Sequence, residues 1–308
     1  MVAFPTETVY GLGANALDAR SVRAIFRAKG RPRDNPLIVH VPSAEFVGQV
    51  AQRIPASARK LMEHFFPGPL TVIVPRHPGV PQEVTAGLDT VGVRCPRHHV
   101  AQEFLQACGC PVAAPSANRS GRPSPTTWQM ALAELDGRIP CILKGGRAEI
   151  GLESTVVDCT GSRPVVLREG AVHLEQLRAV VPSVRTAAGG ERHGPARSPG
   201  LKYRHYAPRP RVILVDGPRD VPVSEAARAA YIGIEARGFR RRPLRVKRCR
   251  AVSDYAKGLF SFFHQCERDG VGTIFCQRVP REGLGQALMD RLHRAAEPAR
   301  TRKAERSF

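Results

Sequence analysis

The sequence predicts an α/β protein in two domains: a twisted, mixed sheet with flanking helices over residues 1–181, and a smaller α/β domain over residues 211–308. Three observations support this. The chain has 308 residues, roughly twice the length of a typical domain. Apolar runs of strand length alternate with amphipathic helical stretches along both parts. Between them, residues 182–210 are rich in Gly, Pro and Arg and lack apolar periodicity, which predicts a linker.

The first domain has strand-like and helical segments in mixed order. The strand-like segments are rich in Val, Ile, Leu and Thr, namely VAF, PLIVHV, LTVIVP, TVGVRCP, PVAAPS, CILKGG, STVVDCT and PVVLREG. The helical segments are SVRAIFRAKG, SARKLMEHFF, HVAQEFLQACG and TTWQMALAEL. Ser21 and Ser57 stand where N-caps belong, and Gly30 stands where a glycine ends a helix. Interspersed helices predict a sheet with both parallel and antiparallel pairs.

The second domain shows a simpler alternation. RVILVDG at 211–217 and VGTIFCQ at 271–277 have the pattern of buried strands. SEAARAAYIGIEARG at 224–238 and GLGQALMDRLHRAAE at 283–297 have the pattern of helices. This order predicts a small, Rossmann-like α/β unit.

Composition excludes several classes of protein. Apolar residues make up 42% and charged residues 24%, as in ordinary globular proteins. No apolar run reaches the ~18 residues that a membrane-spanning helix needs. The first ten residues, MVAFPTETVY, lack a basic start and an apolar stretch, so a cytoplasmic protein without membrane association is expected. The eight cysteines include no C-x-x-C pair and are expected to be reduced, mostly buried thiols rather than a zinc site.

The positive charge is concentrated toward the C-terminus. The net charge is +20, and residues 181–308 hold 27 Lys and Arg against 12 Asp and Glu. The densest run is RRRPLRVKRCR, from Arg240 to Arg250. Such a run attracts phosphate chains without base specificity, which predicts at most weak RNA binding. The simpler interpretation is a solvated basic face, because no aromatic stripe accompanies the run as a stacking surface would require.

Four loop segments combine turn residues with polar side chains. They are residues 4–13, 29–36, 113–125, and 151–155 together with 166–170. The Gly-x-Gly in the first lacks the third glycine of a dinucleotide fingerprint. Three cations in five positions, Lys29 to Arg33, are unfavourable unless an anion joins them, although a solvated turn is the alternative. Ser116 and Asn118 alternate along one segment, so both side chains are expected on the same side.

Taken together, the segments resemble a known family. PTETVYGLGAN, KGRP-x-DNPLIVH, FFPGPLTVIV, VTAGLDTVGVR, APSAN-x-SGRPSPT, GLESTVVD and VVLREG occur in this order over residues 2–170. They resemble the YrdC-like family of L-threonylcarbamoyladenylate synthases. SPGLKYRHYAP at 198–208 is similar to the linker of the long, two-domain members, and GLGQALMDRLHRA is similar to the end of their C-terminal domain.

The resemblance implies a YrdC-like fold and an enzyme that joins ATP, L-threonine and bicarbonate into threonylcarbamoyl-AMP, with release of pyrophosphate and water. Mg²⁺ would be carried by ATP, with no metal held by the protein and no organic cofactor. A separate transferase complex would pass the threonylcarbamoyl group to adenosine 37 of ANN-decoding tRNAs.

The resemblance also implies site residues. The catalytic group falls on Lys29, Arg31, Ser116 and Asn118. Nucleotide contacts fall on Arg31, Asn35, Ser116, Ser124, Arg168 and Tyr206, with Tyr203 a second choice for the linker tyrosine. Threonine contacts fall on Thr8, His40, Thr90, Arg94, the backbone of Ala114, and Ser154.

The residue types suit this chemistry. The threonine-derived carbamate and ATP are both anionic, so the site has to be cationic and partly dry. The planar fork of Arg94 suits a carboxylate, and the hydroxyls of Thr8 and Ser154 suit recognition of the threonine hydroxyl. No general base stands out. The polar and aromatic linker segment 198–208 is expected to fold over the ATP pocket as a lid, which its deletion would test through ATP consumption and product lifetime.

Three other interpretations stay open. The first is an RNA-binding protein without synthase activity, suggested by the isoelectric point of about 10.6. The second is carbamoyl-adenylate chemistry, as in hydrogenase maturation factors, whose acylphosphatase and zinc-finger regions have no counterpart here. The third is an adenylating enzyme for another amino acid. The chain also starts at the strand before PTETVYG, where family members have a further helix and strand, so an exposed sheet edge or a missing helix face is expected.

Overall fold

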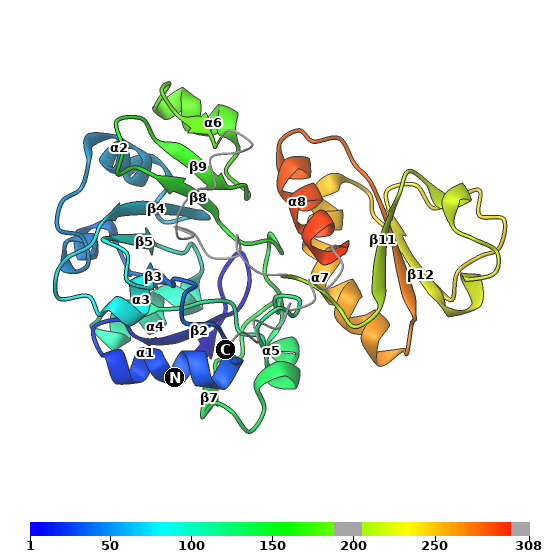
Figure 1. Ribbon diagram of the computed structural model, residues 1–308, viewed down its shortest axis with the longest axis horizontal. Coiled ribbons are helices and arrows are strands. Elements are labelled where there is room, and N and C mark those ends of the chain that lie inside the picture. Colours follow the sequence, from blue (N-terminus) through cyan, green and yellow to red (C-terminus); the bar gives the residue numbers. More distant parts are fainter. Residues whose placement is uncertain (188–204, 297–308) are drawn as a thin grey trace, which may run out of the picture.

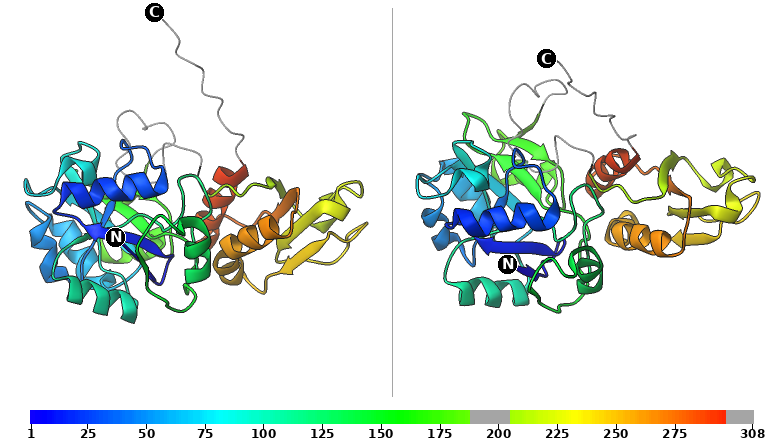
Figure 2. Two further views of the ribbon diagram at one scale, coloured as in Figure 1. Left: turned by 90° about the horizontal axis from the view of Figure 1, so that it is seen from below. Right: turned by 60° about the horizontal axis from the view of Figure 1, so that its bottom comes forward.

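The computed structural model describes residues 1–187 and 205–296, which form two bodies side by side (Figure 1). Each body is built around its own sheet. Two helices of the second body, α7 (Val252–Arg268) and α8 (Leu284–Ala296), lie between its sheet and the first body (Figures 1 and 2). The α/β class predicted from the sequence is confirmed.

Within the described residues, the sheet of the first body has ten strands in the order β10-β9-β8-β4-β5-β3-β6-β2-β1-β7. Strand β4 is antiparallel to β5 and parallel to β8, so the predicted mixed sheet is confirmed. Its segment LTVIVP is buried at five of six positions, as expected for a strand covered on both faces. The strands are β1 (Val2–Phe4), β2 (Gly11–Asn15), β3 (Ile38–His40), β4 (Leu70–Pro75), β5 (Thr90–Arg94), β6 (Val112–Ala113), β7 (Cys141–Ile142), β8 (Thr155–Asp158), β9 (Val165–Arg168) and β10 (Arg185–Thr186).

Helices pack on this sheet: α1 on β2, α2 on β4 and α4 on β1. Helix α1 ends at Gly30, whose φ of 60° is left-handed, as predicted. The predicted N-caps are wrong. The Asp18 carboxylate, not Ser21, accepts two first-turn N–H groups at 2.9 and 3.2 Å, and α2 begins after Pro55 rather than Ser57. The helices are α1 (Ala19–Lys29), α2 (Ala56–Phe65), α3 (Gln82–Thr85), α4 (His99–Cys108), α5 (Trp128–Leu135) and α6 (Leu174–Val180), with a 3₁₀ helix at Ala44–Gln49.

The second body has a small parallel sheet, in the order β11-β14-β12-β13. Helix α8 packs on β11 and α7 packs on β12. The strands are β11 (Arg211–Val215), β12 (Ala229–Gly233), β13 (Arg245–Arg248) and β14 (Thr273–Gln277), with 3₁₀ turns at Pro218–Asp220 and Ala226–Arg228. The small α/β unit is as predicted.

The helix predicted over residues 224–238 is wrong. Its middle forms β12, which is buried at all five positions. A strand covered on both faces appears in the sequence as a continuous apolar run, and periodicity alone does not separate such a run from a buried helix. Helix α7 and strand β13 were not predicted. Gly258 in the interior of α7 lowers its helix propensity.

Both edges of the large sheet differ from expectation. Strand β1 pairs with β2 on one side and with β7 on the other, so of the two expected consequences the exposed edge does not apply to β1: a segment from later in the chain covers it. At the opposite edge, β10 lies inside the predicted linker. Residues 188–204 of that linker lie outside the described part of the chain.

Five of the eight cysteines are buried, and all eight are free thiols, in agreement with the expected thiol chemistry. Within residues 1–187 and 205–296, no helix combines the length and apolar character that crossing a membrane requires. Five arginines of the basic run are exposed, on edge strand β13 and beside it, namely Arg240, Arg241, Arg242, Arg248 and Arg250.

The contact between the two bodies is apolar at its centre. Val9 and Leu152 of the first body share one buried cluster with Tyr255 and Phe260 of α7. Gly151 lets the two backbones approach each other, because a Cβ at this position would lie 2.6 Å from the Cα of Lys257. The second body is therefore packed against the first and not merely tethered to it.

We expect Gly151→Ala to weaken this contact. The φ of Gly151 is 81°, so any side chain there is strained by about 1–2 kcal/mol, and the clash with α7 adds roughly 1–3 kcal/mol. Gly87→Ala is the matched control, since Gly87 has a φ of 80° and a Cβ added there would meet no other atom within 4 Å. Thermal unfolding should show the larger loss for Gly151→Ala, and equal losses would contradict the close approach.

Candidate active site

A small cavity of about 70 Å³ lies at one end of the large sheet of the first body. Its wall consists of the turn between β1 and β2, the turn after α1, strand β3, the end of β5, the loop after β6, the loop before β8 and the end of β9. His205 and Tyr206, at the end of the linker, complete it. The four loop segments singled out in the sequence therefore meet at one place.

The cavity is positively charged. Among the described residues, four arginines line it, namely Arg31, Arg94, Arg122 and Arg168, against one acidic residue, Glu153. Low-dielectric walls concentrate such a field. The cavity is therefore suited to an anionic ligand.

Hydroxyl groups shape the turn between β1 and β2. The Thr6 hydroxyl accepts the backbone N–H groups of Thr8 and Val9, each at 3.2 Å, and donates to the Val9 carbonyl at 2.6 Å. Its oxygen lies 2.9 Å from the Thr8 hydroxyl oxygen. This bonding holds the Thr8 hydroxyl at the cavity wall.

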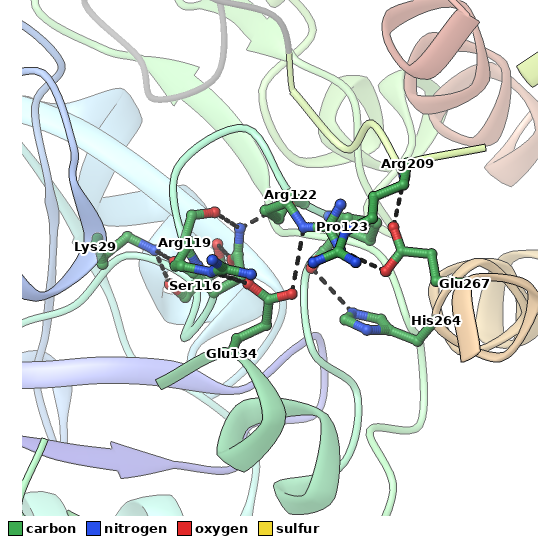
Figure 3. A network of polar contacts seen from close by, with 10 residues as sticks. Lys29, Ser116, Arg119, Arg122, Pro123, Glu134, Arg209, His264 and Glu267 are labelled. Carbon is green, nitrogen blue, oxygen red and sulfur yellow. Dashed lines mark hydrogen bonds and ion pairs between the residues drawn. The ribbon is translucent and has the colours of Figure 1, made fainter. Parts of the chain in front are cut away.

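A lysine that does not line the cavity holds the loop after β6 in place (Figure 3). The Lys29 ammonium donates to the backbone carbonyls of Ser116 and Asn118. The Ser116 hydroxyl donates to the Asn118 side-chain oxygen at 2.5 Å, which places both side chains on one side, as predicted. Burial, and then the charge of Arg31, lower the pKa of Lys29 well below its usual value. Lys29 does not line the cavity, whereas Arg31, Ser116 and Asn118 do.

Backbone carbonyls fix Arg31 in the turn after α1. Its Nε donates to the Asn35 carbonyl at 3.2 Å and its Nη2 to the Pro36 carbonyl at 2.9 Å. Burial lowers the pKa of Arg31 to about 10, so it stays charged at neutral pH. Asn35 is buried and acts here by holding Arg31, without lining the cavity.

Arg168 and Ser154 form a second fixed group. Arg168 donates to the Ser154 carbonyl and to the Ser154 hydroxyl, both at 3.1 Å. The Ser154 hydroxyl oxygen also lies 2.8 Å from that of Thr71 on β4. The end of β9 is thereby tied to the start of β8 beside the cavity.

The second body contributes to the site through Arg291 on α8. This side chain is fully buried, and its Nε donates to Glu153 at 3.0 Å. The other Glu153 oxygen accepts the Ser124 hydroxyl at 2.6 Å. The Arg291 guanidinium also stands 5.6 Å from the centre of the Tyr206 ring. Burial by itself would raise the pKa of Glu153, but the charges of Arg291 and Arg168 outweigh it and keep the carboxylate ionised.

Arg94 and His40 line the other end of the cavity. Arg94 pairs with the buried carboxylate of Glu7 at 2.8 Å and contacts the Gly68 carbonyl at 3.4 Å. Burial, and then the nearby charge of Arg94, lower the pKa of His40 to about 3. His40 is therefore a neutral hydrogen-bonding group at neutral pH.

Most residues predicted from the sequence line the cavity. These are Thr8, Arg31, His40, Arg94, Ala114, Ser116, Asn118, Ser124, Ser154, Arg168 and Tyr206. Lys29, Asn35 and Thr90 do not. Thr90 lines a separate pocket of about 10 Å³, which meets the cavity wall at Ile38.

Sequence reasoning missed several residues of the site. Glu7, Arg122 and Glu153 lie within the quoted motifs, but no role was assigned to them. Arg291 lies in the second domain, 138 positions from Glu153, and no local pattern pointed to the site. His205, by contrast, belongs to the segment 198–208 that was expected to cover the pocket, and it lines the cavity.

Comparisons with known proteins cover both bodies. Residues 1–170 match the Sua5/YciO/YrdC family model, described as telomere recombination, and residues 172–297 match the threonylcarbamoyl-AMP synthase C-terminal domain. A threonylcarbamoyl-AMP synthase of Pyrococcus abyssi is 43% identical, over 96% of this chain and 90% of that protein. One of Bacillus subtilis is 40% identical, over 96% and 89%. The crystal structure of P. abyssi Sua5 complexed with L-threonine matches with a TM-score of 0.88 at 43% identity, over 96% of this chain and 90% of that one.

The buried His40 predicts a pH dependence of stability. Between pH 6.5, the usual histidine pKa, and about 3, the unfolded chain binds a proton at this position and the folded chain does not. Stability therefore falls as the pH falls, by up to about 1.4 kcal/mol per pH unit for one such group. His40→Gln should reduce the loss of unfolding free energy between pH 6.5 and 4, measured by urea unfolding, whereas the exposed His77→Gln should not. Part of the slope should remain, because burial also lowers the pKa of His205 to about 3. An unchanged slope in His40→Gln would contradict the neutral state.

Proposed function

The chain belongs to the threonylcarbamoyl-AMP synthase family in its two-domain form, and we propose that the cavity of the first body is where L-threonine, bicarbonate and ATP become threonylcarbamoyl-AMP. The observation that most supports this site is that, among the described residues, four arginines and only one acidic residue line the cavity. Two anionic reactants meet in this reaction, and a fixed positive field offsets their repulsion.

The reaction has two bond-forming steps. The deprotonated threonine amine attacks the bicarbonate carbon, and loss of water leaves a carbamate. A carbamate oxygen then attacks the α-phosphorus of ATP, and the bond from that phosphorus to the bridging oxygen breaks to release pyrophosphate. Charge moves to the departing pyrophosphate, so catalysis consists mainly of positioning and charge stabilisation.

We assign the nucleotide end to the group around Arg31 and Arg168. Each guanidinium is already held by hydrogen bonds to protein oxygens, so little reorganisation accompanies binding. Ser116, Asn118 and Ser124 offer hydroxyl and amide groups beside them. Lys29 acts indirectly in this assignment. Its ammonium donates to the Ser116 carbonyl and so holds the loop that carries Ser116.

We assign the threonine end to the group around Arg94 and His40. Arg94 would hold the amino-acid carboxylate with the part of its fork not engaged by Glu7. The hydroxyls of Thr8 and Ser154 and the backbone of Ala114 line the same cavity. Polar partners of this kind discriminate against substrates that lack the matching group.

Magnesium would enter as part of the MgATP substrate. Glu153 is the only carboxylate among the described residues that line the cavity, and Ser124 and Arg291 already occupy both of its oxygens. The chemistry of this set does not favour a resident divalent cation. We also propose that the protein works in the cytoplasm and that a separate transferase takes the product to adenosine 37 of ANN-decoding tRNAs.

The linker end would act as a lid. Cavities that bind drug-sized ligands have volumes of roughly 300–1,000 Å³, and this one has about 70 Å³ with Tyr206 in its wall. The Tyr206 ring stacks on Phe260 of α7, with centroids 5.5 Å apart. Withdrawal of residues 205–206 would therefore admit ATP, and their return would exclude water from the mixed anhydride.

The activity can be tested directly. The protein is incubated with MgATP, ¹⁴C-bicarbonate and each of several amino acids, and labelled adenylate and pyrophosphate are measured. We expect a product only with threonine and only with Mg²⁺ present. Product with another amino acid, or product without any amino acid, would contradict the proposed substrate. Tight RNA binding without pyrophosphate release would favour a non-catalytic RNA-binding protein.

Arg31→Met should impair the nucleotide step. Hydrogen bonds to a charged group contribute about 1.5–3 kcal/mol, so we expect kcat/KM for ATP to fall roughly 10- to 100-fold. Arg33→Met is the matched control, because Arg33 lies in the same turn and is exposed. Similar kinetics for the two variants would show that Arg31 does not contact the nucleotide.

A further inference from the structure

One polar face of helix α7 follows the loop that carries Ser116 and Asn118. Ser261, His264 and Glu267 are spaced by three positions, so they lie on one side of the helix. The Ser261 hydroxyl lies 2.9 Å from that of Thr126, and the His264 ring lies 3.4 Å from the Pro123 carbonyl oxygen. The second body thus contacts this loop at successive points.

Glu267 makes the charged contact of this face (Figure 3). One of its oxygens pairs with the Arg122 guanidinium. The other accepts the backbone N–H of Arg209 at 2.6 Å. The Glu267 side chain is 10% exposed and that of Arg122 is 17% exposed, so water screens the pair only partly. One carboxylate therefore joins the active-site loop to the end of the linker.

Arg122 connects this contact to the cavity. Its backbone carbonyl accepts the Asn118 amide at 2.8 Å, and Asn118 accepts the Ser116 hydroxyl at 2.5 Å. Arg122 lines the cavity and also an open cleft of about 650 Å³ between the two bodies. It is therefore a residue of the loop that borders both.

We propose that Glu267 is a positioning residue for the nucleotide step: through Arg122 it holds the loop of Ser116 and Asn118 in its reactive arrangement. The proposal rests on the proposed function. Without the carboxylate, the Arg122 side chain keeps one ion-pair partner among the described residues, Glu134, whose oxygen lies 3.4 Å away. The loop then gains other conformations, and small displacements of positioned groups cost rate.

Loss of the Glu267 carboxylate should affect the kinetics with ATP and not those with threonine. The threonine end is built on β3 and β5, whose residues His40 and Arg94 lie on paired strands. Ala114, whose backbone is assigned to threonine, opens the loop after β6 and is tied to β3 by its N–H bond to the Ile38 carbonyl at 2.9 Å. Glu267 holds the far end of this loop through Arg122, next to the groups assigned to ATP. A loosened loop should therefore change the ATP kinetics and leave the KM for threonine unchanged, which a general loss of folding would not do.

The test compares Glu267→Gln with Asp269→Asn. Asp269 ends the same helix and forms an ion pair with Arg245 of its own body, so the control removes a similar charge without touching the loop. For Glu267→Gln we expect kcat to fall about tenfold, equivalent to ~1.4 kcal/mol. The KM for threonine should stay within about twofold of wild type, since the threonine site is unaltered. Thermal midpoints of the two variants should be similar.

A double variant tests the route through Arg122. If Glu267 acts by holding Arg122, then Arg122→Gln/Glu267→Gln should be no slower than Arg122→Gln alone. The proposal is overturned if Glu267→Gln is as fast as Asp269→Asn, if the KM for threonine rises with the loss of kcat, or if the two losses multiply. A wild-type chain without any threonine-dependent product would instead overturn the proposed function, and this inference with it.

Discussion

A fully buried guanidinium, that of Arg291, joins the two bodies of this protein. Burial by itself would lower its pKa, but Tyr206, Glu153 and Asp290 outweigh burial and raise it. It donates to Glu153 and to the Glu169 carbonyl at 2.7 Å. Breaking such a buried pair costs about 3–5 kcal/mol, because one charge is left uncompensated. The second body therefore supports the cavity wall at Glu153, although its own described residues do not line the cavity.

Other arginines around the cavity are likewise held by oxygen atoms of the protein. Arg31 is held by backbone carbonyls, Arg94 by Glu7, and Arg168 by Ser154. Each cation is fixed before a ligand arrives, while the cavity as a whole stays positive. A preorganised field of this kind suits a reaction whose charge moves onto a departing pyrophosphate, since little reorganisation accompanies the step.

Much of the fold followed from local patterns. The strands LTVIVP and RVILVDG and the helix that ends at Gly30 have strong apolar runs or clear end signals, and each lies where predicted. The wrong predictions concern elements whose structure depends on residues that are distant in the sequence. Strand β12 was predicted as a helix because a buried parallel strand has no period of two. The partner of β1 was missed because β7 comes from a segment far along the chain.

The sequence by itself determined the class of fold, the order of the motifs and the residue types that surround the cavity. Three features depend on tertiary structure alone. Lys29 holds the loop of Ser116 without lining the cavity, Thr90 lines a separate pocket, and Arg291 binds Glu153. The physical reason is the range of the interactions. Turns, caps and strand runs arise from neighbouring residues, whereas a buried charge pair across 138 positions exists only once two separately built surfaces have packed together.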